Sequence, residues 1–264
     1  MIHRNVKSKE PKARIQKQES KSKNPKARNQ KQEVKGMVSM QKQKQISESL
    51  QLGIILALSG GFMDAYSYVC RGKVFANAQT GNILLCGVNL SEGNWQLALK
   101  YLCPILAFVL GLALTNMVQL HRKDKKVIHW RQITILFEAA VLLLVGFLPQ
   151  SLNLLANSIT SFACGIQVES FRKINGNVAA TTMCIGNLRS ATNAICEFLY
   201  TKEKKAALRG ILYFTIICFF VIGAILGNVS VRLLQEKAII ISTLFLLIGF
   251  IMMFFYKEEN IAMD

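Results

Sequence analysis

The sequence predicts an all-α transmembrane protein, a polytopic helical bundle of about six spans. Of its 264 residues 52% are hydrophobic, and the mean hydropathy is +0.31 although the first fifth of the chain is very polar. Several apolar runs approach the roughly 20 residues that cross about 30 Å of hydrocarbon. Polar segments containing glycine interrupt these runs twice, at a constant shift of 105 positions. Breaks of this kind inside membrane-length sequence are typical of the two halves of a transporter or channel.

Six apolar runs are predicted to span the membrane. The fourth is the most polar of them, because it contains Asn153, Asn157, Thr160 and Gln167. A buried amphipathic segment is the alternative for that run. The predicted spans are 51–70, 97–120, 133–148, 152–170, 208–231 and 238–256.

The internal repeat divides the predicted membrane domain into residues 49–148 and 149–257, followed by a short tail at 258–264. Gln-Thr-Gly-Asn at 79–82 corresponds to Ile-Gly-Asn at 185–187, and Asp64 corresponds to Glu169. Each repeat holds three spans, an odd number, so the second half is expected to run through the membrane inverted relative to the first. Both Gly-Asn segments would then be re-entrant or broken helices that enter the membrane from opposite sides. Such backbone is tolerated only where it is buried in protein or lines water.

Charge predicts the orientation. Cytoplasmic loops near spans collect Lys and Arg. With both termini inside, the basic clusters at 121–131 and 171–207 also lie inside. The rival is eight spans, with 75–90 and 179–198 as full crossings. That arrangement would place the 121–131 cluster outside, so six spans are favoured.

A basic arm at 1–48 precedes the first span. Residues 1–50 hold 14 Lys and Arg against four Glu, and the arm repeats Pro-Lys-Ala-Arg at 11–14 and 25–28. Without apolar periodicity it is expected to be disordered. A solvated cytoplasmic arm is the simplest interpretation, and contact with anionic lipid head groups is the second. Nucleic-acid binding is not expected, because the arm has no interleaved aromatics or folded module.

Asp64 is the sharpest candidate for function. A carboxylate at membrane depth costs at least a few kcal/mol, so it should face the bundle interior or a cavity. It belongs to a small and polar face of the first span, formed by Gly53, Ala57, Gly60, Asp64, Ser67 and Arg71. The functional interpretation is contact with a cation, proton or substrate. The structural one is a carboxylate bonded to backbone or paired with Arg71 or Lys73.

The two Gly-Asn segments supply the other candidates. Asn both donates and accepts hydrogen bonds, and Gly permits a helix break that exposes backbone groups. The alternative is a tight helix crossing with Asn as a cap. The predicted solute or ion contacts are Asp64, Gln79, Thr80, Gly81, Asn82, Gln167, Thr182, Gly186 and Asn187.

The remaining motifs carry less weight. Glu138 and Glu197 are expected near the membrane interface, and Gly223-x-x-x-Gly227 predicts close helix packing. The seven Cys form no C-x-x-C pair and the three His form no cluster, so we expect no metal and no cofactor. No nucleotide-binding loop or hydrolase motif is present, and we expect no enzyme.

Gly60-Gly-Phe-Met-Asp64-Ala followed by Phe75-Ala-Asn-Ala-Gln-Thr-Gly-Asn82 resembles the DUF1275 group of bacterial membrane proteins, also called the YoaK family or UPF0700. The second half agrees at Gly165-Ile-Gln167, Phe171-Arg172, Thr181-Thr182 and Gly186-Asn187, but Cys184-Ile185 departs from the expected Thr. The resemblance covers roughly residues 50–256. It implies a polytopic inner-membrane protein without an established substrate.

Together these observations predict a protein of the bacterial cytoplasmic membrane that binds or passes a small polar solute or ion. The lipid bilayer is its expected partner. The alternatives are a membrane enzyme acting on a lipid-linked substrate, for which only Asp64 and Glu169 are candidates, and a scaffold or sensor that recruits partners through the basic arm.

Overall fold

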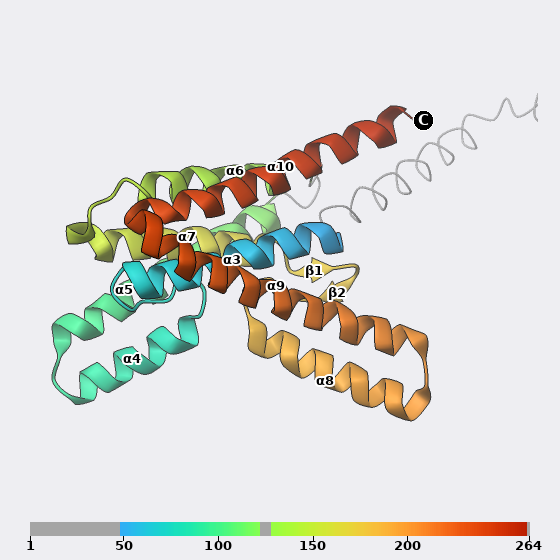
Figure 1. Cartoon of the computed structure of the whole chain (residues 1–264), viewed down its shortest axis with the longest axis horizontal. Helices are drawn as coiled ribbons and strands as arrows, with labels where there is room; N and C mark the ends of the chain where they lie inside the picture. The colour runs from blue at the N-terminus through green and yellow to red at the C-terminus, as the bar shows by residue number, and fades with distance from the viewer. Residues whose placement is uncertain (1–47, 122–127, 263–264) are drawn as a thin grey trace, which may run out of the picture. The chain divides into compact units, whose positions relative to one another are not determined.

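The computed structural model describes residues 48–121 and 128–262, so the predicted arm at 1–48 lies almost wholly outside the described residues. Apart from the connecting segments and one hairpin with strands of two residues each, the described chain is helical, which confirms the all-α class (Figure 1). The helices are α3 Leu50–Cys70, α4 Gln79–Ser91, α5 Trp95–His121, α6 Ile128–Val145, α7 Asn153–Ser170, α8 Cys184–Thr201, α9 Lys204–Leu234 and α10 Ile239–Ala262.

Each predicted span corresponds to one of these helices, with ends that differ by a few residues. α10 continues to Ala262, beyond the predicted end of the last span at residue 256. Among the described residues, three stretches are long and apolar enough to cross a membrane: Leu50–Cys70, Trp95–His121 and Lys204–Phe254. The third stretch contains α9 and, as far as Phe254, α10; a 3₁₀ turn, Gln235–Ala238, joins these two helices. α6 and α7, with 18 residues each, are not among the three.

Each contact between two helices has a counterpart between the corresponding helices of the other half. At a shift of 105, α3, α4, α5 and α6 correspond to α7, α8, α9 and α10. α3 packs on α9 as α7 packs on α5, α4 packs on α5 as α8 packs on α9, and α3 packs on α10 as α7 packs on α6. α6 and α10 pack on each other. The sequence repeat is therefore matched by corresponding helix contacts.

Glycine allows the two main crossings to be close. A Cβ built on Gly61 would collide with the backbone carbonyl of Phe220, and one built on Gly165 would collide with that of Phe108. Gly223 and Gly227 also lie against the backbone of α3, where a Cβ built on Gly223 would collide with the Leu58 carbonyl and one built on Gly227 would be 2.8 Å from the Phe62 carbonyl oxygen. The close packing predicted for Gly223-x-x-x-Gly227 is thus confirmed. These contacts hold α3 against α9 and α7 against α5 at backbone distance.

The segment between α3 and α4 folds back along α3. Gly72 and Lys73 turn the chain with positive φ of 86° and 65°. The backbone N–H of Asn77 then reaches Asp64, six residues before the end of α3, at about 9 Å for a rise of 1.5 Å per residue. α4 consequently begins beside the interior of α3.

The corresponding segment after α7 is longer but arrives at the same place. It contains a hairpin of β1 Lys173–Ile174 and β2 Asn177–Val178, turned by Asn175 and Gly176 with positive φ. Thr182 then packs on Gly60 of α3, and α8 begins two residues later.

The predicted position of the helix breaks is one respect in which the sequence interpretation was wrong. Gly81 and Gly186 lie within the first turn of α4 and α8, and the irregular backbone precedes them. Gly81 is needed for a different reason, since a Cβ there would lie 2.6 Å from the Phe75 ring.

Candidate functional site

Asp64 lies on the buried face of α3 and is 6% exposed. Its Oδ1 accepts hydrogen bonds from the backbone N–H of Asn77 at 2.7 Å and of Ala78 at 3.4 Å. These are the amides that lead into α4, so the carboxylate also faces the positive end of that helix dipole. Oδ2 is buried and has no hydrogen-bond partner among the described residues. Oδ1 therefore holds the segment before α4, whereas Oδ2 is free to accept a further contact.

Neither Arg71 nor Lys73, the two partners considered for Asp64 from the sequence, forms an ion pair with it. Arg71 is fully buried, and its guanidinium donates to the Tyr66 hydroxyl at 2.8 Å, to Asn153 Oδ1 at 3.2 Å and to the Val145 carbonyl at 2.8 Å. Lys73 lies over the Tyr68 ring, 4.7 Å from its centroid. None of the ion pairs formed by the described residues involves Asp64.

Two buried polar side chains lie against the same part of α3. Asn77 Nδ2 donates to the Gly60 carbonyl at 3.4 Å, which leaves Asn77 Oδ1 without a partner in the described chain. The Thr182 methyl group lies over Gly60, where a built Cβ would be 2.6 Å away, and Thr182 Oγ1 is likewise buried and unpartnered there. At the repeat shift of 105, Asn77 and Thr182 are corresponding residues. Corresponding residues of the two halves thus both contact Gly60.

A second buried carboxylate belongs to Glu138 in α6. It is 1% exposed, so its carboxylate is enclosed by the protein and does not reach the surface of the bundle. With the Gln167 carboxamide oriented so that its nitrogen faces Glu138, Gln167 donates to both carboxylate oxygens at 2.5 and 2.6 Å. Cys164, one turn before Gln167 on α7, contacts Met63 of α3, with 3.9 Å between the two sulfur atoms. The polar face predicted on the first span is buried, and of the polar residues noted in the fourth span, Asn157, Thr160 and Gln167 are buried and Asn153 is partly exposed.

Gln79 and Asn82 form a network that shapes the segment before α4. Asn82 is fully buried; its Oδ1 accepts from the Phe75 N–H at 3.0 Å, and its Nδ2 donates to the Phe75 carbonyl at 2.8 Å and to Gln79 Oε1 at 2.9 Å. Gln79 Nε2 donates to the Ala76 carbonyl at 2.9 Å. Asn187 makes the equivalent bond, donating to the Ala180 carbonyl at 2.6 Å. Neither Asn caps its helix, because the N-cap residues of α4 and α8 are Ala78 and Met183; both Asn side chains instead bond back to the segment that precedes the helix.

Three of the predicted contacts lie away from this centre. Thr80 and Gly186 are exposed, and nothing lies within 4 Å of a Cβ built on Gly186. Gly81 contacts the Phe75 ring and is partly exposed. Asp64, Gln167 and Thr182 are the predicted residues that the structure brings into the buried polar region.

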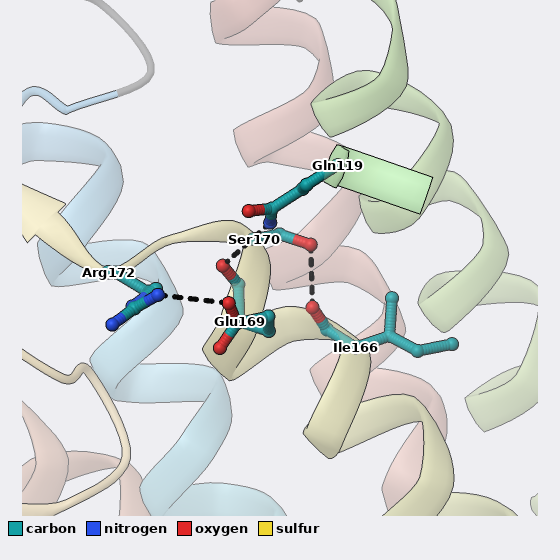
Figure 2. Close-up of polar contacts among 5 residues, drawn as sticks. All are labelled: Gln119, Ile166, Glu169, Ser170 and Arg172. Atoms are coloured by element: carbon teal, nitrogen blue, oxygen red, sulfur yellow. Dashed lines mark hydrogen bonds and ion pairs between the residues drawn. The ribbon is translucent and has the colours of Figure 1, made fainter. Parts of the chain in front are cut away.

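Glu169, which corresponds to Asp64 in the repeat, has a different environment. Figure 2 shows it at the C-terminal end of α7, where its carboxylate pairs with Arg172 at 3.0 Å and its carbonyl accepts from Gln119 of α5 at 3.2 Å. The Arg172 side chain is 63% exposed. α7 ends one residue after Glu169, whereas α3 continues for six residues beyond Asp64. Of the two corresponding carboxylates, Asp64 is therefore buried within its helix and Glu169 lies at the end of its helix.

Two residues of the buried region were not predicted as contacts, Asn77 and Glu138. A signal for Asn77 existed in the sequence, because the shift of 105 pairs it with Thr182. No such signal existed for Glu138, whose depth depends on how α6 packs. Among the described residues no three His, Cys, Asp or Glu side chains gather in a way that could hold a metal ion.

Comparison with known proteins finds one family model and one curated relative. A family model described as "Protein of unknown function (DUF1275)" matches residues 52–252. The UPF0700 transmembrane protein YoaK of Bacillus subtilis (strain 168) is 25% identical over 183 residues, which is 65% of this chain and 79% of that protein. No solved structure matches the chain. The motifs around Asp64 and Asn82, the membrane-length helices and these matches identify the chain as a transmembrane protein of the DUF1275 family.

Proposed function

We propose that this protein binds or passes a small polar solute or ion across the bacterial cytoplasmic membrane, through the buried polar region at Asp64. The observation that carries the proposal is the Asp64 carboxylate, buried inside a membrane-length helix with one oxygen unpartnered in the described chain. Ionisable groups at such depth are costly and mark solute or proton pathways. No catalytic step is part of the proposal.

The proposed topology has six spans in two inverted repeats, with α4 and α8 as segments that do not cross the membrane. α8 has 18 residues, as many as α6 and α7, and we separate it from the spans because it carries Arg189 and Glu197. α4 has 13 residues, about 20 Å at 1.5 Å per residue, which is short of a hydrocarbon core of about 30 Å. α4 also begins beside Asp64, which lies six residues before the end of α3. It would therefore run from the middle of the membrane back to the surface at which α3 ends. Both termini would be cytoplasmic, and the basic arm would contact anionic head groups there.

The inverted arrangement explains why the site draws on both halves. The segment ending at Asn77 would enter from the outer side and the segment ending at Thr182 from the inner side, and both end at Gly60. Broken helices that meet at the repeat interface are how many transporters build a binding site. Movement of one half relative to the other would then open or close the site.

Flux into proteoliposomes tests the proposal. The probes are glycerol, urea, NaCl and KCl, measured by stopped-flow light scattering with the full chain. We expect at least one probe to cross faster than in protein-free vesicles, and Asp64→Asn to remove most of that excess. The Asn carboxamide oxygen can still accept the Asn77 N–H, so this variant removes the charge while keeping the structural bond.

The matched control is Glu169→Gln, the corresponding position of the second repeat, where a partly exposed pair with Arg172 is lost. This control should keep the wild-type rate. Equal rates for wild type, Asp64→Asn and protein-free vesicles would contradict the proposal.

A further inference from the structure

Three buried oxygen atoms around Gly60 have no hydrogen-bond partner among the described residues. They are a carboxylate oxygen, Asp64 Oδ2, an amide oxygen, Asn77 Oδ1, and a hydroxyl oxygen, Thr182 Oγ1. The three side chains are 6%, 2% and 3% exposed. Buried polar atoms are nearly always satisfied, and each exception requires an explanation such as an ion.

The three residues are tied to one short stretch of α3. Asn77 bonds to Asp64 through its N–H and to the Gly60 carbonyl through its side chain. Thr182 packs on Gly60 itself, since no Cβ separates its methyl group from the helix. Gly60 and Asp64 are one turn apart on the same face, so the residues that carry the unpartnered oxygens belong to or contact a single turn of α3.

The charge of this cluster is set by Asp64. The other buried carboxylate, Glu138, has both oxygens engaged by Gln167. The ion pairs of the described chain join Arg131 to Glu48, Arg172 to Glu169 and Arg209 to Glu197, so none of them neutralises Asp64. With Asp64 ionised, the cluster offers one negative charge and three acceptor oxygens.

We propose that Asp64, Asn77 and Thr182 bind one small monovalent cation, an inference that rests on the proposed function and names its ligand. Carboxylate, amide and hydroxyl oxygens are the donors that hard cations prefer. A single free carboxylate matches a single positive charge, whereas divalent ions in proteins recruit more oxygens and more carboxylates. Na⁺, K⁺ and NH₄⁺ share this chemistry, and an ammonium ion would donate N–H bonds to the same three oxygens.

The residues that complete the site come from both repeats. Asn77 precedes α4 and Thr182 precedes α8, so separation of the two halves would remove one ligand from the cation. Binding would thus favour the conformation in which both segments meet at Gly60.

Thermal unfolding of the full chain in detergent tests the site, with NaCl, KCl and NH₄Cl titrated against choline chloride at constant ionic strength. A ligand that binds only the folded state raises the unfolding temperature in a saturable way. We expect one of the three cations to do so for the wild type, and Asp64→Asn to weaken the apparent Kd by at least about tenfold.

A second variant keeps the test decisive if Asp64→Asn folds poorly. Thr182→Val keeps the shape that packs on Gly60 and removes only the hydroxyl. We expect it to weaken the apparent Kd about three- to tenfold, the equivalent of one neutral ligand. Glu169→Gln is the control and should leave the cation response unchanged.

The two proposals fail separately. If no cation gives a saturable shift, or if the shift is the same in all variants, the cation site is wrong; an Asp64-dependent flux of glycerol or urea would still support the polar pathway. If a cation binds as described but no probe crosses in proteoliposomes, the site stands and passage across the membrane is wrong.

Discussion

At the scale of single residues, Asn82 shows how one side chain positions a whole segment. Its carboxamide both donates to and accepts from the Phe75 backbone and also bonds to Gln79. Asn is suited to this because it carries a donor and an acceptor on one planar group. The same geometry, with a single bond, recurs at Asn187. The two Gly-Asn motifs therefore fix the backbone that carries Asn77 and Thr182.

Substitution of Asn82 is expected to destabilise the fold. Asn82→Ala removes three hydrogen bonds and leaves the Phe75 amide and carbonyl without this partner, so we expect the free energy of unfolding to fall by about 1–3 kcal/mol. Thermal unfolding in detergent measures this. Asn193→Ala, on the exposed face of α8, is the control and should change stability by no more than about 0.5 kcal/mol. Equal stabilities of the two variants would show that the Asn82 network is not structural.

At the scale of elements, the protein depends on crossings at which helix backbones touch. Gly61 and Gly223 allow α3 to meet α9, and Gly111 and Gly165 allow α5 to meet α7. Small residues give this close approach in membranes, where van der Waals packing drives helix association. α4 and α8, in contrast, pack mainly on the helix that follows each of them.

A methyl group at a crossing should separate its helices. Gly165→Ala would drive a Cβ into the Phe108 carbonyl, and overpacking of this kind costs about 1–3 kcal/mol. Gly186→Ala is the matched control, because nothing lies within 4 Å of its Cβ and Ala is the better helix former. We expect a lower unfolding temperature for the first variant and an unchanged or higher one for the second. A fall for Gly186→Ala alone would contradict the assigned crossings.

At the scale of the whole molecule, the sequence predicted the helices better than the site. The six apolar runs correspond to α3, α5, α6, α7, α9 and α10, because length and apolar content determine helices in a membrane. The burial of Asp64 followed from the cost of an exposed charge in lipid. Thr80, Gly81 and Gly186 were placed in the centre wrongly, since their direction depends on where the irregular segment ends and the helix begins. The burial of Glu138 was not predicted, because it depends on how α6 packs in the bundle and not on the position of the residue in its span.

The inverted repeats are tested most directly by finding on which side of the membrane α4 and α8 end. In a variant freed of its seven native Cys, Glu92→Cys labels the turn after α4 and Glu203→Cys labels the turn after α8; both positions are exposed. With six spans in inverted repeats, a membrane-impermeant maleimide applied to intact cells should modify Glu92→Cys. It should reach Glu203→Cys only after the cells are permeabilised. If both positions react from the same side, as eight spans would require, the inverted repeats and the polar centre built on them are contradicted.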